Sequence, residues 1–199
     1  MWQVVTHLGS SSLMLPIFVL ALVGVWLTGQ RAAACTWVMA LSVATVITLV
    51  SKILFYGWGI GIAVLDFTGV SGHTLLASSV FPVLCNWLWD PSTARGPWRG
   101  AVMGVALAAL VAVSRVVVGA HSASEVMIAW MMGLIVSILT LQAMQVAIRP
   151  PWFVRLAPLI LLMALHTSTA TYLPSHDWEV RLSMYLSGRD KPFQRHELL

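Results

Sequence analysis

Three ionisable residues, Arg115, His121 and Glu125, fall within a short stretch that is otherwise almost wholly apolar. His121 and Glu125 are four residues apart, so on a helix their side chains share one face and the carboxylate can accept a hydrogen bond from one imidazole nitrogen. That bond fixes the tautomer and raises the basicity of the other ring nitrogen. A basic, oriented imidazole is a suitable nucleophile toward phosphorus.

A second group of residues is suited to holding and protonating a phosphate. Ser71 and Gly72 stand just before an apolar stretch, where the free N–H groups of a helix N-terminus favour an anion. His73 could donate a proton to a leaving oxygen. Arg115 offers a planar fork for two phosphate oxygens, and Lys52 adds a further cation. Together these residue types predict a site that handles an anion.

Composition places these residues in a membrane protein. Of the 199 residues, 59% are hydrophobic and only 9% charged, whereas a soluble domain carries about 25% charged residues. No basic run indicates binding to nucleic acid. A helix of about 20 apolar residues spans a bilayer, and glycines, prolines and charges delimit six such stretches. The expected helices are about 11–29, 33–55, 72–89, 99–118, 122–147 and 152–172.

The expected fold is all-α, a polytopic six-transmembrane-helix bundle over residues 1–173, followed by a polar C-terminal tail over residues 174–199. Six spans place both termini and the loops after the second and fourth helices on one side, and the candidate site residues map to that side. With Lys52 and Arg115 set aside as site residues, the short loops on the opposite side carry the arginines, which favours the cytoplasm for that side. We therefore expect the site to face outward.

The stretch between the second and third expected helices contains four glycines before Asp66, too many for a regular span. It predicts a short re-entrant or interfacial segment, because irregular backbone at membrane depth survives only within protein or beside water. Asp66 could cap the segment that starts at Thr68 or pair with Lys52.

At these positions the chain resembles the type 2 phosphatidic acid phosphatases. The third motif of that family reads Ser-Arg, five residues, His, three residues, Asp. Ser114, Arg115 and His121 match its spacing, while Glu125 replaces the Asp and lengthens the arm by one methylene. This motif is specific.

The other two motifs of the family match less completely. The second motif, Pro-Ser-Gly-His, is fairly specific and is matched by residues 70–73, with Val70 in place of Pro. The first motif, Lys, six residues, Arg-Pro, is half present, because Lys52 is followed by Gly59 and Ile60. The resemblance covers the motifs and the six-helix layout, about residues 10–172.

The resemblance implies an integral membrane phosphatase that hydrolyses a lipid-linked phosphate or pyrophosphate, such as undecaprenyl pyrophosphate or phosphatidylglycerol phosphate, in a bacterial inner (plasma) membrane. His121 would attack phosphorus, Glu125 would orient His121, and His73 would protonate the leaving group. The reaction would pass through a phosphohistidine and need no metal or other cofactor. The expected partners are the lipid phosphate substrate and membrane lipids, with no nucleic acid. The phosphoryl oxygens would be held by Lys52, Ser71, Gly72 and Arg115.

Other functions fit the same residues. A lipid phosphotransferase would share the phosphohistidine and differ only in its acceptor. A transporter could line an anion path with the cations, although the sequence has no evident internal repeat and the polar residues gather at one face rather than at the midplane. The departures at Gly59 and Glu125 fit a non-catalytic scaffold. In that case His121 and Glu125 form only a structural pair.

Overall fold

The computed structural model describes residues 1–89, 98–144 and 175–197, and the regular elements in these ranges are helices. One isolated β-bridge joins Ile62 and Phe67. The all-α fold class is therefore confirmed. The elements are α1 (Trp2–His7), α2 (Ser11–Leu27), α3 (Arg31–Trp58), η1 (Ala63–Leu65), α4 (Gly72–Leu88), α5 (Arg99–Val117), α6 (Ala123–Ala143), α8 (Ser175–Ser187) and η2 (Arg195–Glu197).

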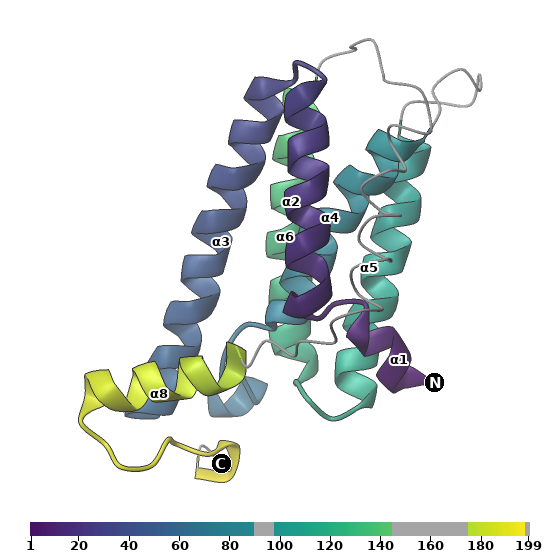
Figure 1. The fold of residues 1–199 in the computed structure, drawn as a ribbon. Coiled ribbons are helices and arrows are strands. Elements are labelled where there is room, and N and C mark those ends of the chain that lie inside the picture. Colours follow the sequence, from purple (N-terminus) through teal and green to yellow (C-terminus); the bar gives the residue numbers. More distant parts are fainter. Residues whose placement is uncertain (90–97, 145–174, 198–199) are drawn as a thin grey trace, which may run out of the picture.

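The helices α2 to α6 run up and down as neighbours in one bundle, and α8 lies across the end of the bundle where α3 ends (Figure 1). The short helix α1 lies at this same end, beside α5. Both described ends of the chain are therefore at the end of the bundle where α4 and α6 begin. The elements that carry the candidate site residues meet there.

The first five expected helices are present, with ends shifted by at most a few residues. Glycines set two of these ends, because Gly29 follows α2 at φ 80° and Gly59 ends α3 at φ 70°, a left-handed conformation that glycine adopts without strain. The sixth expected helix, 152–172, lies outside the described residues. Two α-helices of the described residues, α1 and α8, were not expected from the sequence.

Three of the helices, α3, α5 and α6, are long and apolar enough to cross a membrane, and α2 is a shorter apolar helix. The outward side chains of α3 are large and hydrophobic, among them Met39 at 68% exposure and Val43 at 59%. Such a surface suits lipid better than water. The described part of the chain thus has the character of a membrane protein.

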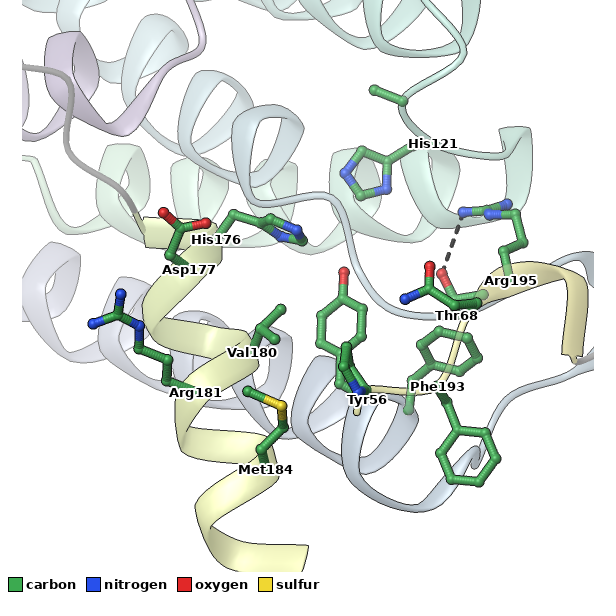
Figure 2. A pocket seen from close by; sticks show the side chains of 14 residues that line it. Tyr56, Thr68, His121, His176, Asp177, Val180, Arg181, Met184, Phe193 and Arg195 are labelled. Atoms are coloured by element: carbon green, nitrogen blue, oxygen red, sulfur yellow. Dashed lines mark hydrogen bonds between the residues drawn. The ribbon is translucent and has the colours of Figure 1, made fainter. Parts of the chain in front are cut away.

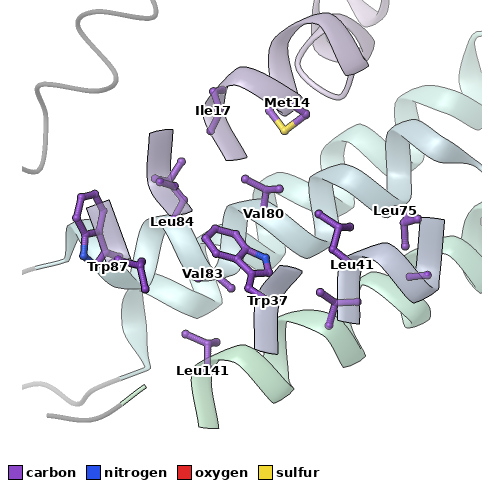
Figure 3. Packing of buried hydrophobic residues seen from close by; sticks show 14 of the residues in the cluster. Met14, Ile17, Trp37, Leu41, Leu75, Val80, Val83, Leu84, Trp87 and Leu141 are labelled. Carbon is purple, nitrogen blue, oxygen red and sulfur yellow. The ribbon is translucent and has the colours of Figure 1, made fainter. Parts of the chain in front are cut away.

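Helix α4 forms the centre of the bundle and is mostly buried. Trp37 of α3 is fully buried against it, and its indole N–H donates to the carbonyl of Ser79 at 3.1 Å. Around this ring pack Val80 and Val83 of α4 and Leu41 of α3 (Figure 3). This packing fixes α3 relative to α4, and hence Lys52 relative to the start of α4.

Small residues let α5 and α6 approach the backbone of α4 closely. A Cβ atom added to Gly104 would lie 2.5 Å from the Cα of Pro82, and one added to Gly100 would lie 2.7 Å from the Cα of Asn86. This four-residue spacing of small residues is typical of packed membrane helices. On the other side, the hydroxyl of Ser137 in α6 donates to the carbonyl of Ser78 at 2.5 Å. The three helices thus form a tight unit.

Candidate active site

Five of the candidate residues line one cavity of about 540 Å³ at the end of the bundle where α8 lies: Lys52, Gly72, His73, Arg115 and His121. They come from α3, from the start of α4, from the end of α5 and from the loop that follows it. His73 and His121, which are 48 positions apart (121 − 73), thus face a common space. Much of the remaining wall is apolar and includes Leu15, Leu41, Leu49, Leu75 and Leu76.

His121 and Glu125 make the expected contact, with Nδ1 of the imidazole 2.7 Å from Oε2 of the carboxylate. His121 is not on the helix, however, because α6 begins at Ala123 and Ser122 is its N-cap. Ser122 and Glu125 form a capping box, in which the backbone N–H of Ser122 donates to Oε2 of Glu125 at 3.1 Å. The carboxylate therefore points back toward His121 from the first turn of the helix.

Glu125 is fully buried, and its carboxylate accepts several further hydrogen bonds. The backbone N–H of Thr68 donates to Oε1 at 2.7 Å, and the Thr68 hydroxyl donates at 2.5 Å. A buried carboxylate is costly unless donors compensate it. With its acceptor positions filled by donors, Glu125 is ionised and accepts a hydrogen bond from Nδ1–H of His121, which leaves Nε2 of His121 with a lone pair for attack.

The start of α4 lies at the cavity, as an anion site requires. Ser71 is the N-cap, but its side chain does not cap the first N–H groups of α4. Ser71 itself is fully buried, accepts a hydrogen bond from the Thr74 hydroxyl at 3.1 Å, and is not among the residues that line the cavity. Gly72 has open space at the position of a Cβ atom. The helix end thus faces the cavity through Gly72 and His73.

The two cations of the cavity are held by neighbouring elements. Lys52 Nζ lies 2.7 Å from Oε2 of Glu179 in α8. Arg115 donates from Nη1 to the hydroxyl of Thr6 in α1, at 2.8 Å. The two helices that were not expected from the sequence therefore position both cations.

The C-terminal segment, residues 175–197, contributes an arginine that the sequence did not single out. Nη2 of Arg195 lies 2.8 Å from Oε2 and 2.9 Å from Oε1 of Glu125, and Nη1 lies 2.6 Å from Oδ2 of Asp66. Figure 2 shows Arg195 beside Thr68, in the pocket that His121 and Tyr56 also line. No spacing rule connects residues 70 positions apart, so sequence alone offered no signal for this contact.

The two roles expected for Asp66 are both wrong. Its carboxylate pairs with Arg195 rather than with Lys52, which pairs with Glu179. The backbone N–H of Thr68 is satisfied by Glu125 and not by Asp66. Asp66 itself has a left-handed backbone, at φ 46°. The physical reason is that the C-terminal segment brings opposite charges to both Lys52 and Asp66.

Gly59, where the first motif would have arginine, makes room for this segment. A Cβ atom at position 59 would lie 3.0 Å from the ring of Phe193. The backbone N–H of Phe193 donates to the carbonyl of Tyr56 at 3.0 Å, which fixes the segment two residues before Arg195. The space beside the end of α3 is therefore occupied by the C-terminal segment.

The environment of His121 favours its neutral form. Burial lowers the pKa of His121, the hydrogen bond and charge of Glu125 oppose this shift, and the positive charges of Lys52 and Arg115 add to it, so that the net direction is downward. A neutral imidazole with a hydrogen-bonded Nδ1 is the form that can attack phosphorus. Beside it are a second histidine, two cations and an uncapped helix N-terminus.

The chain is similar in sequence to known proteins. The model of the PAP2 superfamily matches residues 55–149, a range that includes Ser71, His73, His121 and Glu125. The chain is also 31% identical, over 204 residues, to the protein described as "Uncharacterized 22.5 kDa protein in cps region" from Klebsiella pneumoniae. That match covers 99% of this chain and 97% of the other. No solved structure matches the chain.

Proposed function

Because the chain belongs to the PAP2 superfamily of membrane-associated phosphatases, we propose that it hydrolyses a lipid-linked phosphate or pyrophosphate through a phosphohistidine on His121. The observation that carries this proposal is that His121, bonded through Nδ1 to the buried Glu125, shares one cavity with His73, Lys52 and Arg115. A nucleophile, an acid and phosphate-binding cations are the parts that such a reaction needs.

In the proposed reaction, Nε2 of His121 forms a bond to phosphorus while the bond from phosphorus to the leaving oxygen breaks. The negative charge of the bound phosphate favours the protonated form of His73, which gives its proton to that oxygen, and Glu125 stabilises the positive charge that develops on the His121 ring. Water then attacks phosphorus, His73 takes up a proton from it, and the phosphorus–nitrogen bond breaks to release inorganic phosphate. Lys52, Arg115 and the backbone N–H of Gly72 hold the phosphoryl oxygens throughout.

The apolar part of the cavity wall supports a lipid as the rest of the substrate. The leucines of this wall come from α2, α3 and α4, whereas the cations gather at the end of the bundle. A molecule with its tail in the bilayer and its phosphate at the membrane surface can contact the apolar wall and the cations at the same time. An undecaprenyl pyrophosphate-type carrier lipid and phosphatidylglycerol phosphate both have this form.

We also propose that the site faces outward from a bacterial inner membrane. Among the described residues, Arg31 and Arg99 lie at the opposite end of the bundle, at the starts of α3 and α5, and arginines in short loops favour the cytoplasm. A membrane-impermeant maleimide applied to intact cells should label Lys191→Cys in a chain without Cys35 and Cys85. Labelling only after the membrane is opened would show that the site faces the cytoplasm instead.

The activity is tested with purified protein in detergent, lipid pyrophosphate and lipid monophosphate substrates, and a metal chelator. We expect phosphate release from the wild type and from His196→Ala, whose exposed histidine lies outside both cavities, and loss of release from His121→Ala. Release that persists in His121→Ala, or no release from any lipid phosphate, would contradict the proposal.

A phosphotransferase is the second candidate, because a further cavity of about 520 Å³ also reaches His121 and is lined mainly by the C-terminal segment. It leaves room for an acceptor larger than water. Supplying a second lipid with a free hydroxyl distinguishes the two: a transferase yields the phosphorylated acceptor, whereas a hydrolase yields inorganic phosphate alone.

A further inference from the structure

The carboxylate of Glu125 carries a full negative charge in a fully buried position, and among the described residues Arg195 is the cation in contact with it. Thr68 and the N–H of Ser122 donate neutral hydrogen bonds. A guanidinium that donates to both carboxylate oxygens supplies a compensating positive charge and also fixes the orientation of the carboxylate. Hydrogen bonds of this charge-assisted kind are about twice as strong as neutral ones. Arg195 therefore accounts for much of what keeps this charge stable inside the protein.

Arg195 is itself held from several directions. Nη1 bonds to the backbone oxygen of Asp66 at 3.1 Å and to its carboxylate at 2.6 Å, and Nη2 lies 3.2 Å from the Thr68 hydroxyl. The ring of Phe193 packs at Gly59, two residues earlier. A planar group with these anchors keeps one orientation, so it can in turn hold the Glu125 carboxylate in one orientation.

We propose that Arg195 of the C-terminal segment is a positioning residue for the reaction: it holds Glu125 in line with Nδ1 of His121 and limits how strongly that carboxylate draws positive charge onto the imidazole. This inference rests on the proposed function of His121. It assigns a role in the reaction to a residue that lies outside the range matched by the family model. The C-terminal tail thereby becomes part of the active site.

The proposal has a definite electrostatic consequence. Without the Arg195 charge, Glu125 stabilises the imidazolium form of His121 more strongly, so the pKa of His121 rises. The Glu125 carboxylate also becomes more mobile, so His121 spends a smaller fraction of the time in the orientation needed for attack. The other titratable or charged groups that line the cavities around His121 are Lys52, Tyr56, His73, Arg115, His176, Asp177, Glu179 and Arg181, and these are unchanged in an Arg195 variant.

The test compares Arg195→Gln, Arg195→Lys and the control Lys191→Gln, which removes an exposed cation from the same segment. The pKa of His121 is measured without turnover, from the pH dependence of its carbethoxylation by diethyl pyrocarbonate, followed by mass spectrometry of the His121 peptide. We expect the midpoint to rise by about one pH unit in Arg195→Gln. It should return toward the wild-type value in Arg195→Lys and stay unchanged in Lys191→Gln.

Kinetics on the same proteins complete the test. In Arg195→Gln we expect kcat to fall roughly 10- to 100-fold, with little change in KM, because the arginine acts through Glu125 rather than on the substrate. An unchanged midpoint with unchanged kcat would overturn the inference. So would a raised KM with unchanged kcat, which would make Arg195 a substrate ligand. Should Arg195→Gln fail to fold, Asp66→Asn removes one anchor of the guanidinium and is expected to shift the midpoint upward by a smaller amount.

The two proposals fail in different ways. If the wild type releases no phosphate from any lipid, the proposed function fails, while the carbethoxylation midpoints still report whether Arg195 controls His121. If phosphate release depends on His121 but the midpoint does not respond to Arg195, only the positioning role is overturned.

Discussion

Oε2 of Glu125 accepts from Nδ1 of His121 at 2.7 Å and from Nη2 of Arg195 at 2.8 Å, so one carboxylate oxygen joins a histidine that precedes α6 to an arginine of the C-terminal segment. The capping box of α6 holds this carboxylate in place from within its own helix. The capping box of α6 and the long-range contact with Arg195 thus both involve Oε2 of Glu125.

Replacing Glu125 by glutamine is expected to lower kcat roughly a thousandfold. The amide is uncharged, so it stabilises the developing imidazolium less, and it leaves Arg195 without its buried counter-charge. Phosphate release under saturating substrate measures this. Asp190→Asn, which neutralises an exposed carboxylate of the C-terminal segment, is the control and should behave as the wild type. Equal rates in the two variants would contradict a role for Glu125.

The acid limb of the pH profile of kcat/KM is expected below pH 6.5. His121 attacks in its neutral form, and because its pKa in the protein lies below the ordinary value of 6.5, this form persists to lower pH than for a free histidine. As the pH falls through the lowered pKa, protonation of His121 removes the nucleophile and the rate declines. Initial rates between about pH 4 and pH 8 test this. A limb above pH 7 would show that the pKa is raised instead.

Glu179→Gln is expected to lower KM about two- to fivefold. In the structure the Glu179 carboxylate forms an ion pair with the ammonium group of Lys52. A substrate phosphate must compete with Glu179 for that cation. Partly exposed ion pairs contribute about 1 kcal/mol or less, which limits the effect to this range. KM for a lipid phosphate measures it. An increase in KM would show instead that Glu179 helps to present Lys52 to the substrate.

Gly104→Ala is expected to destabilise the bundle by about 1–3 kcal/mol. The added methyl group meets the backbone of α4 at Pro82, which cannot move aside as a flexible side chain would. Thermal unfolding in detergent measures the change, with Val102→Ala as the control because Val102 is 66% exposed on the same helix. A Gly104→Ala protein as stable as this control would show that α4 and α5 are less tightly packed than described.

The sequence was sufficient for the elements that depend on local rules. The first five expected helices follow from apolar runs and their breakers. The contact between His121 and Glu125 was also expected, although it forms across the N-cap of α6 and not along one helix face. The sequence was insufficient wherever the contact depended on tertiary packing. No local sequence pattern predicts the contact of Lys52 with Glu179 or that of Glu125 with Arg195. The polar composition of the C-terminal stretch likewise does not indicate that it forms α8 and packs against α3.

The most direct measurement of the central claim is the detection of the phosphohistidine itself. Protein turning over a lipid phosphate is stopped in alkali, because a phosphorus–nitrogen bond of this kind is unstable in acid, and the peptide that contains His121 is analysed by mass spectrometry. The account predicts a phosphoryl group on His121 during turnover, and none on any residue of His121→Ala. Turnover without phosphorylation of His121, or with the phosphoryl group on another residue, would contradict it.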